Sequence, residues 1–112
     1  MTAKTRAEKM EETRVKLIAA GRKAFAQKGY ADASMDELTA SAGLTRGALY
    51  HNFGDKLGLL AAVVDEIDSA MAQKAKDAGE AAGGGWNGLM AEGRTYIELA
   101  LDPEIQRIVL RD

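Results

Sequence analysis

The stretch that decides the fold is residues 34–56, which read SMDELTASAGLTRGALYHNFGDK. Ser34 is placed to cap a short helix, and Glu37, three residues later, completes a capping box. Gly43 interrupts the helical pattern where a left-handed residue is needed, and Thr45 is placed to cap a second short helix. Two short helices joined by a glycine-containing turn are typical of a helix-turn-helix, whose second helix reads DNA.

Arg46 and Tyr50 are the side chains of this second helix that most favour a function. A cation at the start of a helix is unfavourable for the helix dipole, so Arg46 points to an anionic partner. Tyr50 leaves two interpretations open, an aromatic residue at the edge of the core or a hydroxyl placed at a phosphate.

The composition favours a chain made only of helices. The sequence of 112 residues is 46% hydrophobic and 29% charged, with one proline and 5% aromatic residues. Ala, Leu, Glu, Lys and Met dominate, and these are good helix formers. We therefore expect an all-α fold: a three-helix bundle containing the helix-turn-helix, a long connecting helix, and a partial helical C-terminal domain. The corresponding ranges are 1–56, 57–78 and 79–112.

A long amphipathic helix is expected before the motif, over about residues 11–28. Val15, Ile18 and Phe25 recur at helical spacing on its apolar face. The cations near the chain start either contact phosphate or are simply solvated; they are Lys4, Arg6, Lys9 and Arg14.

The chain after the motif predicts helices whose apolar faces lack a partner. One helix is expected over 56–78, with an apolar face formed by Leu57, Leu60, Val63, Ile67 and Met71. The glycines of GEAAGGG, residues 79–85, predict a flexible loop. A helix over 86–101 follows, with an expected inner face formed by Leu89, Met90, Gly93, Ile97 and Leu101. Trp86 and Met90 are interpreted as core or as the lining of a small-molecule pocket. Asp102-Pro103 signals a further helix start.

The charge is distributed unevenly along the chain. Residues 1–60 hold ten Lys or Arg and seven Asp or Glu, a net charge of +3, whereas residues 61–112 hold five and ten, a net charge of −5. A basic first half followed by an acidic remainder suits a DNA-binding head on a body that need not touch DNA.

Several classes of site and location are not expected. The sequence has no cysteine, which excludes disulfides and thiolate metal sites. His51 is the only histidine and lacks companion ligands, so we expect no metal, no cofactor and no catalytic residues. The start of the chain has no signal-peptide pattern, and no apolar run is long enough to cross a membrane. A cytoplasmic protein is therefore expected.

Three segments together resemble the N-terminal region of TetR-family transcriptional regulators: residues 19–30 (AAGRKAFAQKGY), residues 34–56, and residues 59–64 (LLAAVV). The resemblance covers roughly residues 10–70. Its matched positions are Phe25, Gly29-Tyr30, Ala42-Gly43-Leu44-Thr45, Leu49-Tyr50, Phe53 and Lys56. Asn52 departs from the family pattern, where His is common, and Leu57 stands where a charged residue often follows. Asn52 can still read adenine through two hydrogen bonds.

The resemblance implies a repressor that binds a near-palindromic double-stranded DNA operator as a homodimer and is released by a small-molecule effector. It implies DNA contacts by Thr45, Arg46, Gly47, Ala48, Tyr50, His51 and Asn52, with Ser34 and Lys56 at flanking phosphates. Family members are usually about twice this length. An alternative hypothesis is a helical protein-interaction or ligand-binding module that does not bind DNA, suggested by the acidic second half and the unpartnered apolar faces.

Overall fold

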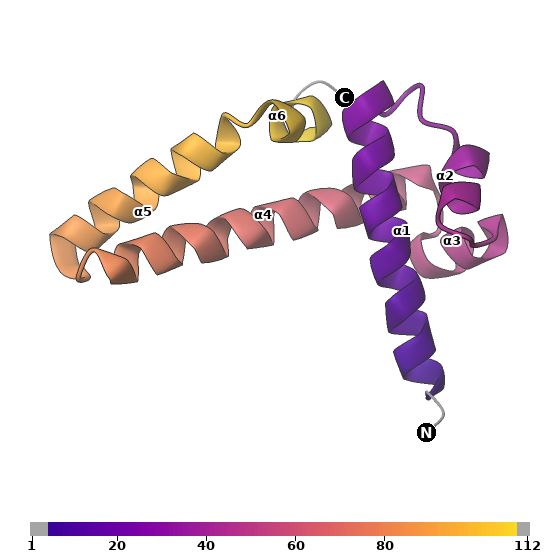
Figure 1. Cartoon of the computed structure of the whole chain (residues 1–112), viewed down its shortest axis with the longest axis horizontal. Helices are drawn as coiled ribbons and strands as arrows, with labels where there is room; N and C mark the ends of the chain where they lie inside the picture. The colour runs from indigo at the N-terminus through magenta and orange to yellow at the C-terminus, as the bar shows by residue number, and fades with distance from the viewer. Residues whose placement is uncertain (1–4, 110–112) are drawn as a thin grey trace. The chain divides into compact units, whose positions relative to one another are not determined.

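The computed structural model describes residues 5–109, and six α-helices with no strand account for the regular structure in that range (Figure 1). They are α1 (Arg6–Lys28), α2 (Met35–Ser41), α3 (Arg46–Phe53), α4 (Lys56–Ala81), α5 (Gly85–Ala100) and α6 (Pro103–Val109). The predicted all-α fold is confirmed. The chain divides into two compact units, Met1–Val63 and Val64–Asp112, and α4 contributes to both.

The first three helices begin at polar caps. The hydroxyl oxygens of Ser34 and Thr45 accept hydrogen bonds from the backbone N–H groups of Glu37 and Ala48, at 3.3 and 3.2 Å. Both caps were predicted and are confirmed. The Thr5 hydroxyl oxygen likewise accepts the Glu8 N–H at 3.1 Å, and α1 begins at Arg6. The prediction of a start near residue 11 was therefore wrong. A hydroxyl cap satisfies backbone donors that the first helical turn leaves unpaired.

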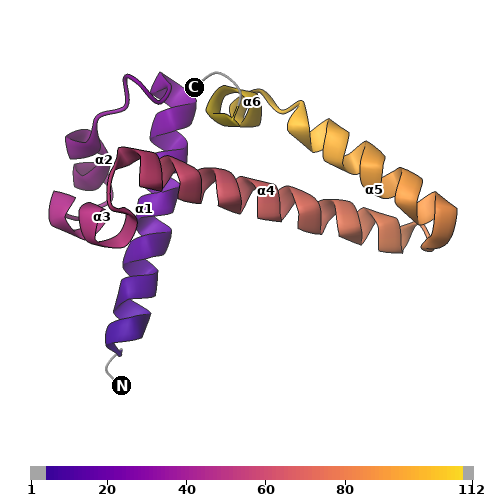
Figure 2. The same cartoon turned by 180° about the vertical axis from the view of Figure 1, so that it is seen from behind.

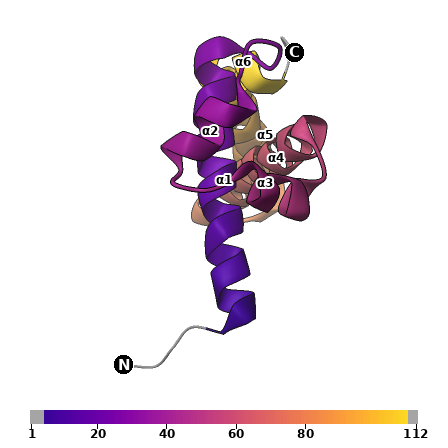
Figure 3. The ribbon, with the colours of Figure 1, turned by 90° about the vertical axis from the view of Figure 1, so that its right-hand side faces the viewer.

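The core of the first unit is formed where α2 and α3 pack against α1 (Figures 2 and 3). Its fully buried side chains are Leu17, Phe25, Leu49, Leu59 and Val63. Val15 was expected in this core but is 55% exposed. The buried stripe of α1 runs through Leu17, Gly21 and Phe25, which turns Val15 toward solvent.

The start of α4 packs against α1 through a close approach at Gly21. A Cβ atom at Gly21 would lie 3.1 Å from the side chain of Leu59, so the missing side chain leaves room for that leucine. The carboxylate of Asp55 caps α4 by accepting the Gly58 N–H at 2.7 Å. Leu57, predicted on the apolar face, is exposed, and Leu59 takes the buried position.

In the second unit a pair of glycines lets α4 and α5 approach at backbone distance. A Cβ atom on Gly88 would lie 2.8 Å from the carbonyl oxygen of Gly79, and one on Gly79 would lie 3.0 Å from that of Gly88. Further along, the Tyr96 hydroxyl donates to Asp68 at 2.8 Å. This hydrogen bond raises the pKa of Tyr96, because the neighbouring carboxylate disfavours the tyrosinate.

The predicted loop at residues 79–85 is shorter in the structure. α4 continues to Ala81, and α5 already begins at Gly85. Gly79 lies within α4, where its missing side chain permits the close approach to α5. The chain reverses through Gly83 and Gly84, at φ +94° and +71°.

The face of α5 that was expected to point inward is exposed. Leu89, Met90, Ile97 and Leu101 are all exposed, and Trp86 is 72% exposed. The interpretation of Trp86 and Met90 as core residues was therefore wrong. Asp102 caps α6, which begins at Pro103 as predicted, because its carboxylate accepts the Glu104 N–H at 2.8 Å.

No helix within residues 5–109 is both long enough and apolar enough to cross a membrane.

Replacing Gly58 with alanine is expected to destabilise the protein. A Cβ atom there would lie 1.9 Å from the carbonyl oxygen of Phe53, so backbone must shift. We expect a loss of about 1–3 kcal/mol in the free energy of unfolding, measured by urea denaturation followed by circular dichroism.

The matched control is Gly47→Ala in α3, where the nearest atom to the new Cβ would be the Thr45 hydroxyl oxygen at 3.7 Å. This change should stabilise the protein by up to about 1 kcal/mol, because alanine is the better helix former. A Gly58→Ala variant as stable as Gly47→Ala would contradict the packing of the α3–α4 junction.

Candidate nucleic-acid interface

The turn between α2 and α3 is held by its own backbone. Gly43 adopts φ +71°, and its N–H donates to the carbonyl oxygen of Ala40 at 3.1 Å. The Leu44 N–H donates to the carbonyl oxygen of Thr39 at 2.9 Å. Thr39 is buried, and its hydroxyl is satisfied by the carbonyl oxygen of Met35 at 2.9 Å. These bonds fix the direction in which α3 leaves the turn.

α3 has one buried side and one exposed side. Leu49 is 0% exposed, and Ala48 beside it is half-buried. The exposed side carries Arg46, Gly47, Tyr50 and His51. Four of the predicted site residues therefore share a solvent-facing surface that the core does not use.

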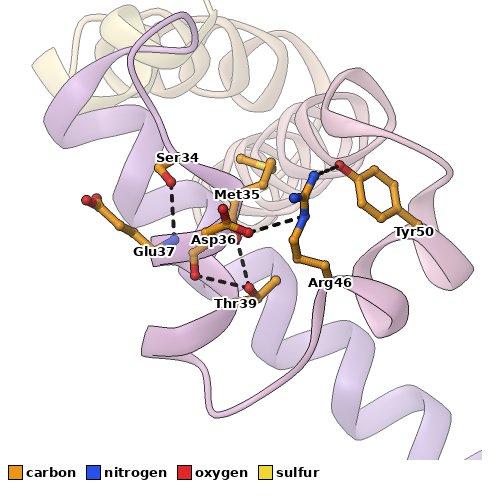
Figure 4. A network of polar contacts seen from close by, with 7 residues as sticks. All are labelled: Ser34, Met35, Asp36, Glu37, Thr39, Arg46 and Tyr50. Carbon is orange, nitrogen blue, oxygen red and sulfur yellow. Dashed lines mark hydrogen bonds and ion pairs between the residues drawn. The ribbon is translucent and has the colours of Figure 1, made fainter.

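The guanidinium of Arg46 is held between α2 and α3 (Figure 4). Its Nε lies 3.3 Å from Oδ1 of Asp36, and its Nη2 donates to the Tyr50 hydroxyl at 2.7 Å. The pKa of Arg46 is raised, first by the hydrogen bond to Tyr50 and then by the charge of Asp36. Because the Tyr50 oxygen accepts this bond, its own O–H remains able to donate to another acceptor.

Three other predicted residues use their polar groups within the head. The Thr45 and Ser34 hydroxyl oxygens cap their helices. Nδ2 of Asn52 donates to the carbonyl oxygen of Ala48 at 2.8 Å, so its amide lies along its own helix. These contacts stabilise the starts of α2 and α3 and hold the Asn52 side chain against its own helix.

Lys56 joins the start of α4 to the segment before α2. Its Nζ lies 3.3 Å from the carbonyl oxygen of Ala31 and 4.6 Å from the centre of the Tyr30 ring. The ring centres of Tyr30 and Phe25 are 5.7 Å apart, so Tyr30 folds back onto α1. An ammonium has three N–H donors, so this contact does not exhaust Lys56.

An open groove separates the first half of α1 from α3. Its walls are formed by Arg6, Lys9, Met10 and Thr13 of α1 and by Gly47, Ala48, His51 and Asn52 of α3. Arg14 instead lies over the Phe53 ring, 5.1 Å from its centre. Lys4, the remaining cation considered for phosphate contacts, lies outside the described residues. The surface of α3 is thus continued by two cations of α1.

Asp36 is a site residue that the sequence did not reveal. It stands ten residues before Arg46, on the other helix of the motif, and local spacing carries no signal for that contact. Only the crossing of α2 and α3 brings the two side chains together. The resulting surface combines cations and a phenol, which suits phosphate oxygens and base edges.

Comparison with known sequence families agrees with this geometry. A family model described as "Bacterial regulatory proteins, tetR family" matches residues 17–63, and one described as "Tetracyclin repressor-like, C-terminal domain" matches residues 86–112. The first match contains α2, α3 and the buried part of α1.

Individual proteins resemble the chain over different lengths. The "HTH-type transcriptional regulator SrpR" of Pseudomonas putida is 45% identical over 64 residues, which is 57% of this chain and 30% of that protein. The "HTH-type transcriptional repressor AcnR" of Corynebacterium glutamicum is 33% identical over 97 residues, which is 87% of this chain and 45% of that protein.

A solved structure is similar along nearly the whole chain. The crystal structure of a TetR-family transcriptional regulator from Pectobacterium atrosepticum matches with a TM-score of 0.81 and 59% identity, covering 97% of this chain and 56% of that one. The chain thus spans less than two thirds of the length of each of these three proteins, between 30% and 56%.

An exposed ion pair joins α1 and α2 and makes the stability of the fold depend on pH. Nζ of Lys28 donates to the Glu37 carboxylate at 2.7 Å, and this hydrogen bond lowers the pKa of Glu37 from its ordinary value. A carboxyl group with a lowered pKa stabilises the fold above its unfolded pKa, and this contribution disappears as the pH falls through the folded value.

Lys28→Gln should therefore lower the urea midpoint near neutral pH, and the difference from the parent should close as the pH falls through the lowered pKa of Glu37. The effect is small because both side chains are exposed. Lys23→Gln, which removes an exposed charge from the same helix, is the control. If the two variants follow the same pH curve, the ion pair makes no contribution.

Proposed function

Because the chain belongs to the TetR family of bacterial regulatory proteins, we propose that it is a sequence-specific DNA-binding transcriptional regulator, and specifically a repressor. In this proposal α3 enters the major groove of double-stranded DNA. The observation that carries it is the exposed side of α3, where Arg46, Tyr50 and His51 lie together without serving the core. Recognition helices of this motif contact bases with their N-terminal residues.

The exposed residues of α3 have distinct proposed roles. Arg46 donates to a base edge, and Tyr50 donates its O–H to a phosphate oxygen. A Cβ atom at Gly47 would make only an ordinary contact with the Thr45 hydroxyl oxygen at 3.7 Å, so packing does not require glycine there. Its place at the helix start suits close approach of the backbone to DNA. His51 lies one turn after Gly47 on the same exposed side.

The remaining predicted contacts belong to the edges of the interface. We assign the Ala48 methyl to an apolar base contact and Thr45 to the DNA-facing start of α3. Asn52 can read adenine if its amide leaves the Ala48 carbonyl. Ser34 and Lys56 are assigned to flanking phosphates, because each keeps donor capacity beyond its internal contact.

The proposal extends to the assembly. We assign DNA reading to residues 1–56, connection to 57–78, and the start of a dimerisation and effector-binding domain to 79–112. A homodimer would present two heads to a near-palindromic operator. The exposed apolar side chains of α5 support this role, since burial in such a domain would remove them from water. A small-molecule effector would release the operator, and the protein would act in the cytoplasm without catalysing a reaction.

The same apolar face favours one alternative function. Trp86, Leu89, Ile97 and Leu101 are exposed on α5, as on a helical interaction or ligand-binding module that does not bind DNA. The two functions differ in whether the head retains affinity for duplex DNA.

Fluorescence anisotropy with labelled duplexes at low salt tests the proposal. The parent should bind, and a random pool should yield a preferred sequence. Lys56→Ala should weaken binding to all sequences alike and reduce the salt slope by about 1. Arg46→Ala should instead reduce discrimination at one base position by about 1–3 kcal/mol.

Lys74→Ala is the control, because it removes an exposed charge from α4 outside the head. Circular dichroism verifies that each variant is folded. If the Arg46→Ala, Tyr50→Phe double variant binds DNA as well as the parent does, the assigned surface is wrong. A parent with no affinity for any duplex would favour the interaction module.

A further inference from the structure

We propose that Asp36 determines what Arg46 reads: its carboxylate holds the guanidinium so that Arg46 contacts a guanine edge instead of a phosphate. This inference rests on the proposed DNA-binding function and assigns Asp36 as a specificity-determining residue of the same site. Asp36 would act through Arg46 and not touch the base itself.

The contact geometry leaves Arg46 equipped for a third partner. Nη2 donates to the Tyr50 hydroxyl at 2.7 Å, and Nε lies 3.3 Å from Oδ1 of Asp36 in an ion pair, so at most two of the five N–H groups of the guanidinium are engaged. Within the described residues, at least three N–H groups remain, enough for a two-bond contact. Figure 4 shows the guanidinium held between the carboxylate and the phenol. Arg46 is thereby oriented before any DNA arrives.

The charge of Asp36 decides which kind of partner fits. A phosphate oxygen brought to this guanidinium would also approach the carboxylate, and two anions close together repel each other. The O6 and N7 atoms of guanine are neutral acceptors in the major groove and match arginine with two hydrogen bonds. Asp36 therefore favours guanine over phosphate as the partner of Arg46.

The ion pair between Asp36 and Arg46 contributes little to the stability of the fold. The side chains of Asp36 and Arg46 are 73% and 54% exposed. Exposed ion pairs contribute little to folding stability because water screens them. The main effect of Asp36 is thus to orient the Arg46 side chain and to offset part of its positive charge. It lowers the sequence-independent attraction of this surface for DNA and raises the preference for one base.

The test compares Asp36→Ala with Asp32→Ala, which removes the same charge from an exposed position in the segment before α2. Duplexes selected by the parent are titrated against variants substituted at each base position. Arg46→Lys keeps the positive charge but lacks the planar guanidinium that can donate two hydrogen bonds to one base. The base position at which this variant loses discrimination is the position that Arg46 contacts. We expect a guanine there, and we expect its preference over other bases to fall by about tenfold or more in Asp36→Ala. Asp32→Ala should keep the preference.

Affinity for unrelated duplexes distinguishes the effect of losing a negative charge from the effect of losing the orientation of Arg46. Both alanine variants should bind random DNA somewhat more tightly, since each loses one negative charge. The inference is overturned if Asp36→Ala discriminates as well as Asp32→Ala, or if the position sensitive to Arg46→Lys is not guanine. In either case DNA binding by the parent leaves the proposed function standing. A parent that selects no sequence overturns both.

Discussion

The burial of Leu49 is the constraint on which the candidate interface depends. Within Arg46–Phe53 it is the one fully buried side chain, at 0% exposure. A helix of eight residues is not stable alone in water, so α3 exists because this leucine enters the core. Once Leu49 points inward, helical periodicity turns Gly47 and His51 to the opposite side, and Arg46 and Tyr50 beside the buried face are also exposed. The core therefore decides which residues α3 can offer to a partner.

Glycines give the two units close approaches that larger residues would prevent. Gly21 makes room for Leu59 in the first unit, and Gly79 meets Gly88 in the second. In each case a helix accepts the lower helix propensity of glycine in exchange for tighter packing against its neighbour. The composition reveals that glycine is frequent, but the facing partner explains why these particular positions lack a side chain.

The polar groups of the head are held by one another before any partner binds. Arg46 contacts both Asp36 and Tyr50. Lys56 contacts the Tyr30 ring and the Ala31 carbonyl oxygen. The Asn52 amide donates to a carbonyl of its own helix. Side chains with fixed directions lose less conformational freedom on binding, which favours specific recognition. Asn52 would exchange its internal contact for an external one, whereas Arg46 and Lys56 can keep theirs because each has further N–H donors.

The sequence by itself determined the helical class, the caps at Ser34 and Thr45 and the turn at Gly43. All of these follow from contacts between residues within one or two helical turns, which spacing alone reveals. Only the tertiary structure decided that Val15, Leu57 and the apolar face of α5 are exposed, that Gly79 is helical, and that Asp36 meets Arg46. Those features depend on which helices lie side by side, and a periodic pattern states that a face is apolar without stating what covers it.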